Sequence, residues 1–268
     1  MTQAVEVAGN AGPGAGEAGP ASQPTRRDRL RAATTEEIIQ TARQLLVASG
    51  PGAVSLRAIA REMGMTAPGL YRYFGSHTEL IRNVCASIFT ELAQDIDRAI
   101  HAAAGPAEQG SEQVTEKLTI KMVAACREFR RWALNHKAEF ALLFGVPLPG
   151  LDDDGRYDIA DECALRFAGV FFALFLELWS RVPFPVPAAE QIDPGLRAEL
   201  LRYRDALGAE IPVGAVLTFL RCWTVLYGAV AMEVFGHIRF ALEDAAPMFE
   251  ITLGDLASLI GLRYPVQA

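Results

Sequence analysis

The apolar side chains of this chain recur mostly at intervals of three and four residues, which is the spacing of one face of an α-helix. Residues 159–180 and 213–236 are apolar almost all round, so these two helices should be buried on most of their faces. No stretch alternates apolar and polar residues convincingly enough to predict a strand, and the sequence therefore predicts an all-α fold. The longer helices predicted in this way cover residues 35–49, 77–103, 113–143, 159–180, 196–208, 213–236 and 246–261.

Residues 55–80, SLRAIAREMGMTAPGLYRYFGSHTEL, contain two short helices joined by a glycine turn and the start of a third helix. Ser55 and Thr66 are each placed to accept a hydrogen bond from the unpaired N–H groups of a first helical turn. Gly64 suits the left-handed conformation that closes a helix, because it has no Cβ. Ser76, with an acid three residues later, begins the third helix as a capping box. This pattern predicts a helix-turn-helix, whose second helix lies in the DNA major groove.

Residues 34–80 resemble the N-terminal DNA-binding domain of the tetracycline-repressor (TetR) family of bacterial regulators. The resemblance rests on a first helix that ends at Gly50, then SLRAIAREMGM, then LYRYF, and then a capped helix that contains Leu80. Thr34, with Glu37 three residues later, is expected to cap the first helix. The resemblance implies a homodimeric DNA-binding regulator, usually a repressor, whose DNA binding is controlled by a small-molecule ligand.

The net charge of −7 argues by itself against a nucleic-acid-binding protein, but the charge is unevenly distributed. Residues 26–82 carry 9 arginines against 5 acidic residues, whereas residues 83–268 carry 16 basic and 25 acidic residues. Positive charge is therefore concentrated where the motif lies and where phosphates would have to be neutralised. Residues 1–25 are mostly small residues and should be disordered. Composition and charge predict a tail at 1–25, a DNA-binding domain at 26–82 and a separate module at 83–268, and the resemblance implies that this module is a ligand-binding and dimerisation domain.

The second helix of the motif begins with small side chains, so it could approach the groove closely and place the methyl groups of Ala67 or Pro68 against thymine. The basic segment 25–31 is either an arm that reaches DNA or a solvated linker. Tyr71 and Tyr73 either contact phosphates or pack with their hydroxyl groups in water. The residues predicted to contact DNA are Arg26, Arg27, Arg29, Ser55, Arg57, Thr66, Ala67, Pro68, Gly69, Tyr71, Arg72, Tyr73 and His77.

Residues 129–150 resemble a segment of the C-terminal domain of a large branch of the TetR family, although Lys137 stands where that branch commonly has proline. A helix break is expected near Asn135. Aromatic residues at every fourth position of residues 159–180 form either ordinary core or the lining of a cavity. The resemblance favours a cavity for a small apolar or aromatic ligand, because the family's C-terminal domains usually enclose one. The residues predicted to line it are Trp132, His136, Phe140, Phe144, Phe171, Phe175 and Trp179.

The helices predicted at 213–236 and 246–261 resemble the pair through which family members dimerise as a four-helix bundle. Small residues in the first of them would allow close approach of a second subunit. The alternative is that both helices are buried within one subunit.

Sequence motifs of the common enzyme classes are missing from the chain, which has no phosphate-binding loop, dinucleotide-binding glycine pattern, GxSxG or HExxH. We therefore predict neither an enzyme nor a cofactor. The four cysteines are scattered without a CxxC pair, which predicts no metal site or disulfide framework and suits a reducing cytoplasm. Asp152, Asp153 and Asp154 lack the spacing of an EF-hand, so a solvated acidic loop is favoured over a calcium site.

The longest apolar run, around residues 167–179, contains Glu177 and is too short to span a bilayer, and no secretory signal is recognisable. We therefore expect a cytoplasmic protein that associates with the nucleoid and not with a membrane. The most complete interpretation is a ligand-responsive regulator that binds a near-palindromic operator as a homodimer. The main alternative is a helical small-molecule-binding protein that has lost sequence-specific DNA binding, and a small enzyme that uses the aromatic cavity ranks third.

Overall fold

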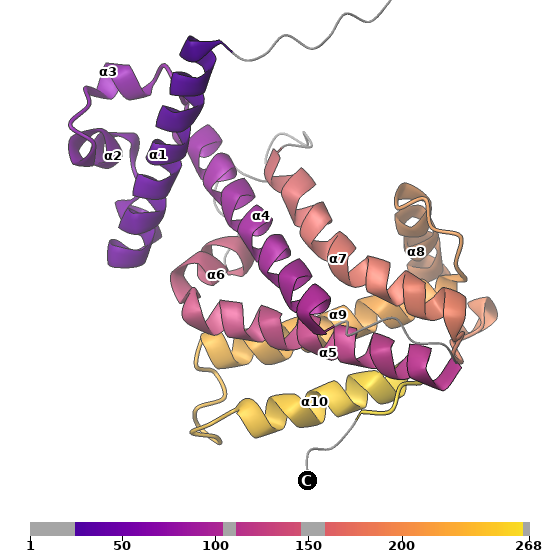
Figure 1. Ribbon diagram of the computed structural model, residues 1–268. Coiled ribbons are helices and arrows are strands. Elements are labelled where there is room, and N and C mark those ends of the chain that lie inside the picture. The colour runs from indigo at the N-terminus through magenta and orange to yellow at the C-terminus, as the bar shows by residue number, and fades with distance from the viewer. Residues whose placement is uncertain (1–24, 104–110, 146–158, 265–268) are drawn as a thin grey trace, which may run out of the picture. The chain divides into compact units, whose positions relative to one another are not determined.

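The computed structural model describes residues 25–103, 111–145 and 159–264, and every regular element in these ranges is a helix, as the all-α prediction requires (Figure 1). The chain divides into two compact units, residues 1–37 and 38–268, and each is described by itself. The α-helices are α1 (Arg26–Ser49), α2 (Leu56–Glu62), α3 (Ala67–Leu70), α4 (His77–Ala103), α5 (Ser111–Asn135), α6 (Lys137–Phe144), α7 (Ile159–Arg181), α8 (Pro194–Ala206), α9 (Val213–Val234) and α10 (Ala246–Leu259). Two 3₁₀ turns, η1 (Pro51–Ala53) and η2 (Ala189–Gln191), complete the set.

Helix α1 begins nine residues earlier than the predicted start at residue 35. Its N-terminus is capped by Thr25, whose Oγ1 accepts a hydrogen bond from the Asp28 N–H at 3.2 Å, while Asp28 Oδ2 accepts one from the Thr25 N–H at 3.0 Å. The Thr34 hydroxyl donates to the Leu30 carbonyl at 3.0 Å, so Thr34 lies inside the helix and the predicted cap was wrong. Arginine is a good helix former, and Thr25 with Asp28 supplies an earlier capping box. The basic segment 25–31 thus forms the first turns of α1.

The predicted helix-turn-helix is present in the second unit as α2, a glycine turn and α3. Ser55 Oγ accepts a hydrogen bond from the Ala58 N–H, and Thr66 Oγ1 accepts one from the Gly69 N–H, both at 3.2 Å. Gly64 has a φ of 63°, which is the left-handed region that only glycine adopts without strain. These three predictions are confirmed, because each depends on contacts within one turn of the chain.

Helix α4 is capped in a slightly different way from the prediction. Ser76 Oγ accepts a hydrogen bond from the Glu79 N–H at 3.0 Å, as in a capping box. The Glu79 carboxylate, however, accepts from the N–H of Gly75 at 2.7 Å instead of returning to Ser76. The carboxylate therefore holds the turn that joins α3 to α4.

The core of the second unit is a bundle in which α4 packs against α5 and α7, while α9 packs against α5, α8 and α10 (Figure 1). Phe129 on α5 is 0 % exposed and lies at the centre of the aromatic side chains of this core. Its ring centroid is 5.7 to 6.2 Å from those of five other rings, which come from α6, α7 and α9: Phe140, Phe144, Phe167, Phe171 and Trp223. One buried side chain therefore connects four helices.

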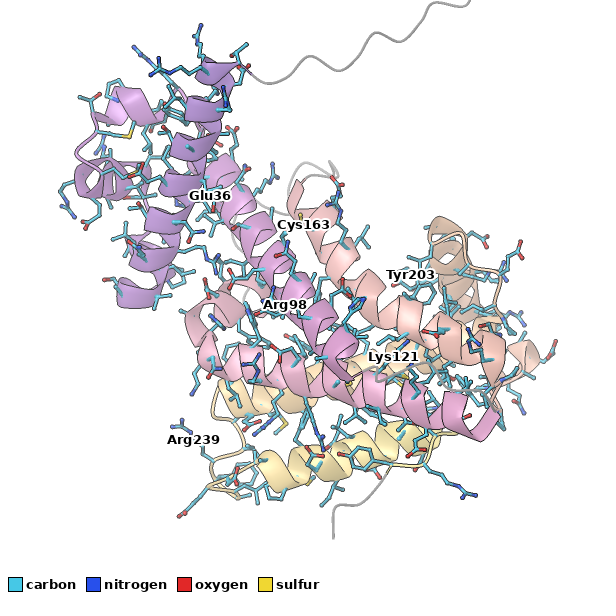
Figure 2. All side chains as sticks on the ribbon, viewed as in Figure 1. Glu36, Arg98, Lys121, Cys163, Tyr203 and Arg239 are labelled. Carbon is cyan, nitrogen blue, oxygen red and sulfur yellow. The ribbon has the colours of Figure 1, made fainter. Side chains whose placement is uncertain are left out.

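Polar side chains join the helices around this core. Arg127 on α5 donates two hydrogen bonds to Glu250 on α10, at 2.9 and 2.8 Å. Lys121 on α5 donates to Glu177 on α7 at 3.3 Å, and Cys163 on α7 accepts from a threonine of α4 at 3.6 Å (Figure 2). The carboxylate of Glu250 has a pKa below its usual value, first because of the hydrogen bonds from Arg127.

One connection was predicted correctly, and a second depends on a glycine that the sequence analysis did not single out. The helix break expected near Asn135 lies at His136, between α5 and α6. At the start of α9, a Cβ on Gly214 would lie 2.0 Å from the Pro187 carbonyl oxygen, so the preceding loop can approach α9 only because position 214 is glycine. The acidic residues Asp152 to Asp154 lie outside the described residues.

By length and composition, the segments Glu162–Arg181 of α7 and Val213–Val234 of α9 could cross a membrane. The sequence argument against a membrane span had considered only the run around 167–179, which is a part of the first segment. Core helices of water-soluble proteins pass the same test. Because α7 packs against α4 and α5, and α9 packs against α5, α8 and α10, packing on several sides explains the apolar character of both.

Candidate DNA-binding surface and apolar cavity

Helix α3 is held in place by buried apolar side chains and presents small residues outward. Leu70 is 0 % exposed and Phe74 is 2 % exposed, so both fix the helix against the rest of its unit. Thr66 and Pro68 are exposed, whereas Ala67 and Gly69 are half-buried. The start of α3 therefore offers methyl and methylene groups to a neighbour, which suits close approach to a DNA groove.

The two tyrosines after α3 differ in accessibility. Helix α3 ends at Leu70, and residues 71–73 continue as hydrogen-bonded turns. Tyr71 is 53 % exposed, whereas Tyr73 is half-buried and packs against the hydrophobic core. Arg72 is exposed between them. Tyr71 and Arg72 are thus more accessible than Tyr73 to a ligand such as DNA.

His77 makes a contact inside the protein that limits its predicted role on DNA. Its Nε2 lies 2.7 Å from the carbonyl oxygen of Val54, which precedes α2. Because a carbonyl oxygen only accepts, Nε2 must carry the hydrogen, and in a neutral ring Nδ1 is then an acceptor. An acceptor cannot bond to a phosphate oxygen, so the predicted phosphate contact requires the protonated imidazolium form of His77.

The remaining predicted DNA contacts lie on two separate units. Arg57 is exposed on α2, and Ser55 is half-buried with its hydroxyl already accepting a backbone hydrogen bond. Arg26, Arg27 and Arg29 are exposed on the part of α1 that belongs to the first unit. Their roles on DNA stay predictions.

An apolar cavity lies within the second unit, between α5, α7, α9 and α10. The cavity has a volume of about 70 Å³, which is enough for several water molecules. A larger ligand would therefore have to displace the walls. The cavity is lined by Thr119, Met122, Val123, Cys126, Phe171, Leu174, Phe175, Phe219, Cys222, Trp223, Leu226, Leu253, Leu256, Ala257, Ile260 and Leu262.

Of the residues predicted to line a ligand site, Phe171 and Phe175 border this cavity. The others lie elsewhere, because helical spacing identifies a buried face but not which buried face borders an empty space. Those outside the cavity are Trp132, His136, Phe140, Phe144 and Trp179. The α5 positions 119, 122, 123 and 126 were missed. Their spacing marks one helix face, but it does not show that this face borders a cavity.

The polar groups in the cavity carry no charge at neutral pH. The Thr119 hydroxyl donates to the Thr115 carbonyl at 2.8 Å, so its donor is already used. Burial raises the pKa of the Cys126 thiol to about 12 and that of the Cys222 thiol to about 11. Thiolates, and not thiols, are the reactive nucleophiles and metal ligands. The cavity is thus suited to an uncharged, apolar molecule and not to reactive-cysteine chemistry.

These thiols predict a loss of stability in mild alkali. In the unfolded chain they ionise near pH 8.5, whereas in the folded protein they stay protonated until well above that pH. A pKa raised by folding gives stability that is complete below the unfolded pKa and is lost as the pH rises. The free energy of unfolding in urea should therefore begin to fall above about pH 8.5 and continue to fall towards about pH 11. The Cys126→Ala/Cys222→Ala variant should show a shallower fall, and an unchanged slope would contradict the prediction.

Among the residues that the structure describes, no group of three or more His, Cys, Asp or Glu side chains could hold a metal ion. The described residues thus present two features: a reading head, residues 66–73, with small exposed side chains at its start, and an apolar internal cavity.

Two protein-family models match this chain, one over the helix-turn-helix and one over the part that contains the cavity. The family model "Bacterial regulatory proteins, tetR family" matches residues 38–84, which contain α2, α3 and the start of α4. The model "Tetracyclin repressor-like, C-terminal domain" matches residues 122–256, about half of the chain. This chain belongs to the TetR family. As a TetR-family protein it is a DNA-binding transcriptional regulator, and the resemblance of residues 34–80 and 129–150 to that family is confirmed.

Relatives of this TetR-family regulator cover most of its length. HTH-type transcriptional regulators of Mycobacterium tuberculosis and Mycobacterium bovis are 28% identical over 213 residues, which is 79% of this chain and 85% of each relative. The crystal structure of the regulatory protein SCO4313 is 27% identical and superposes with a TM-score of 0.65 over 87% of this chain and 100% of that one. A protein of Rhodococcus sp. RHA1 shares the fold, with a TM-score of 0.56 and 19% identity over 91% of this chain and 100% of its own.

Proposed function

We propose that this TetR-family protein is a homodimeric repressor that binds a near-palindromic operator and releases it when a small, uncharged, apolar molecule occupies the cavity. The observation that carries the proposal is the pairing of a helix-turn-helix with an apolar cavity bordered by α5, α7, α9 and α10. A cytoplasmic location at the nucleoid follows from this function. The assigned DNA-binding domain at 26–82 and effector domain at 83–268 are part of the proposal.

A dimer interface on α9 and α10 is supported by exposed apolar side chains on both helices. Val225 and Met232 on α9 are 45% and 42% exposed, and Met248 and Ile251 on α10 are 48% and 60% exposed. The same helices also contribute to the core, so an interior role and an interface role coexist. Apolar side chains gathered on two adjacent helices are typical of a surface that a second copy covers.

Dimerisation fixes the geometry of operator binding. Two α3 helices related by a two-fold axis would enter successive major grooves about one helical turn apart, so the operator should be nearly palindromic. A ligand that binds better to a conformer whose reading heads no longer match this spacing shifts the population away from DNA. By linkage, operator DNA must weaken binding of that ligand by the same factor.

The cavity defines the class of the effector. Its lining is almost entirely aliphatic and aromatic, and its thiols are protonated at neutral pH. An ionised ligand would lose its hydration without gaining a counter-charge there. The effector should therefore carry no net charge and at most a few hydrogen-bonding groups.

A salt series of binding to DNA from beside the protein's own gene, with random DNA of equal length, tests the proposal. We expect tighter binding to the first DNA by roughly a thousandfold or more, a steep salt slope, and two protein chains per site. Equal and weak binding to all fragments in a genome-wide selection would favour the alternative, a helical small-molecule-binding protein without sequence-specific DNA binding.

The dimer can be tested with a charge on the proposed interface. Ile251→Glu should convert the protein to a monomer in sedimentation and lower operator affinity at least tenfold, because a buried unpaired carboxylate opposes association. Leu196→Glu is the matched control, since Leu196 is 42% exposed on α8, which is not one of the two helices of the proposed interface. A dimeric Ile251→Glu variant with unchanged DNA affinity would place the interface elsewhere.

A further inference from the structure

Residues 261–264, the strap, follow α10 and contribute to one wall of the apolar cavity. Helix α10 ends at Leu259 in a Schellman motif, in which the Leu262 N–H donates to the Ala257 carbonyl at 2.8 Å. Gly261 has a φ of 72°, the left-handed conformation that this turn requires. The turn directs Leu262 inward, where it is 5% exposed and lines the cavity, as Ala257 does. The strap thus closes one side of the cavity with an apolar side chain.

Hydrogen bonds of Tyr264 hold the far end of the strap on α5 and α10. Its hydroxyl donates to the carboxylate of Glu250 on α10 and accepts from Arg127 on α5 at 2.9 Å. Burial, and then the hydrogen bond to Glu250, raises the pKa of the Tyr264 hydroxyl, so at neutral pH it keeps the proton that it donates. The side chains of Arg127 and Glu250 are 43% and 40% exposed, so water can replace the hydroxyl when it leaves. Tyr264 is therefore a polar latch, two residues beyond the buried Leu262.

A ligand must displace part of the cavity wall to enter. Every residue that lines the cavity is buried or half-buried. The walls on α7 and α9 carry Phe171 and Trp223, whose ring centroids lie 6.2 and 5.8 Å from that of the fully buried Phe129. Moving either ring would disturb the packing between several helices, whereas moving the strap breaks the contacts of one short segment. Local opening of a short segment is less unfavourable than opening of a core helix, so the strap is the part of the wall that opens most readily.

Gly261 is the residue about which the strap can turn. It directly follows the C-cap of α10, and rotation of its backbone moves no side chain of its own. A Cβ at this position would lie 3.0 Å from the Cβ of Phe184, so the strap and the loop after α7 approach each other closely. The Phe184 ring packs against Phe175 of the cavity wall, with centroids 5.5 Å apart. Rotation at Gly261 would therefore lift the strap from the cavity and leave α10 intact, as at hinges, which lie at the ends of elements.

We propose that the strap is the entrance through which an uncharged, apolar effector reaches the cavity, with Leu262 as the side chain that closes it and Tyr264 as the positioning residue that latches it. The proposal rests on the proposed function, because it names how the effector of that function enters its site. When the latch opens, the strap turns at Gly261 and withdraws Leu262, while α10 keeps its packing against α9. Exposure of Leu262 to water is unfavourable, so the strap closes again over an empty or an occupied cavity. The latch therefore sets the rates of entry and exit and not the affinity.

The first test needs neither effector nor DNA. Cys126 and Cys222 line the cavity, whereas Cys85 and Cys163 are buried and do not line it. N-Ethylmaleimide, an uncharged thiol reagent, should label Cys126 and Cys222 of the full chain about fivefold faster in Tyr264→Phe than in the wild-type protein, because loss of the latch raises the population of the open strap. Cys85 and Cys163 should be labelled at the wild-type rate. Mass spectrometry of the peptides measures all four rates in one sample.

Tyr203→Phe is the matched control for the labelling experiment. It deletes the same hydroxyl group from a half-buried tyrosine on α8 that does not line the cavity, and it should leave all four rates unchanged. Unchanged labelling of the two cavity thiols in Tyr264→Phe would mean that the strap is not the entrance. Equal acceleration at all four thiols would mean that the whole domain opens and not the strap, and this result would also overturn the proposal.

The second test follows N-phenyl-1-naphthylamine, an uncharged fluorescent probe, by stopped-flow fluorescence. In Tyr264→Phe the association and dissociation rate constants should both rise about fivefold, while the dissociation constant stays within about twofold of wild type. A tyrosine that only shaped the cavity would instead change the dissociation constant, and wild-type rates in the variant would overturn the proposal.

The two experiments separate the entrance from the proposed function. If the probe enters with the expected rates but does not release operator DNA from the wild-type protein, the effector role of the cavity fails and the strap remains its entrance. If the probe does not bind the wild-type protein, thiol labelling alone decides whether the strap gives access to the cavity.

Discussion

Replacing Arg72 with alanine should lower the affinity for operator DNA by about 10- to 100-fold, because an arginine that contacts a base edge contributes about 1–3 kcal/mol of discrimination. Arg72 is exposed directly after α3, which enters the major groove in the proposed complex. Affinity for random DNA should fall far less, so the specificity ratio should fall with it. The measurement is fluorescence anisotropy at several salt concentrations with the operator and with a scrambled fragment.

A control variant and a stability measurement make the Arg72 result specific. Arg202→Ala removes an arginine on α8 whose side chain is 72% exposed, so it changes net charge equally without touching the reading head. Its operator affinity should stay within about twofold of wild type, and both variants should unfold at the wild-type temperature because surface substitutions change stability little. If Arg72→Ala bound both DNA fragments like the wild type, α3 and the turn after it would not be the reading head.

Replacing Phe129 with alanine should destabilise the protein by about 3–5 kcal/mol, the cost of removing a fully buried aromatic side chain. Phe129 is 0 % exposed and its ring touches rings on α6, α7 and α9, so no single neighbour can collapse into the space it leaves. Urea unfolding of the purified protein measures the loss. A wild-type midpoint would mean that this aromatic cluster is not the core of the domain.

Phe240→Ala is the matched control for this prediction. Phe240 is 87% exposed, so the same chemical deletion removes almost no buried surface and should change stability by less than about 0.5 kcal/mol. The comparison separates the loss of core packing from any general effect of removing a phenyl ring. Phe129→Ala should also weaken binding of an uncharged apolar ligand, because its neighbours Phe171 and Trp223 line the cavity.

The start of α1 shows how local rules can compete in a sequence. Thr34 with Glu37, and Thr25 with Asp28, both fit the pattern of a capping box. The helix uses the earlier pair, since nothing between them opposes helix formation and Thr34 can instead bond back to the Leu30 carbonyl. The predicted position of Arg26, Arg27 and Arg29 thereby changes from a separate segment to the surface of a helix.

The sequence by itself determined the all-α fold, the helix-turn-helix at α2 and α3, and the break between α5 and α6. These features depend on side chains within one or two helical turns, such as Ser55 with the Ala58 N–H and the left-handed Gly64. Caps, glycines and apolar spacing act over short distances, so they can be recognised without knowledge of the rest of the chain. The membership in the TetR family was readable from the same local motifs.

Only the tertiary structure decided which buried faces border the cavity and which charges meet. Phe171 lines the cavity while Phe140, equally apolar and fully buried, packs outside it. Arg43 and Glu139 form an ion pair across 96 residues of sequence, and no spacing pattern connects positions so far apart. An empty space and a long-range ion pair are properties of how several helices pack together, because each depends on the relative positions of elements and not on the residues of any one of them.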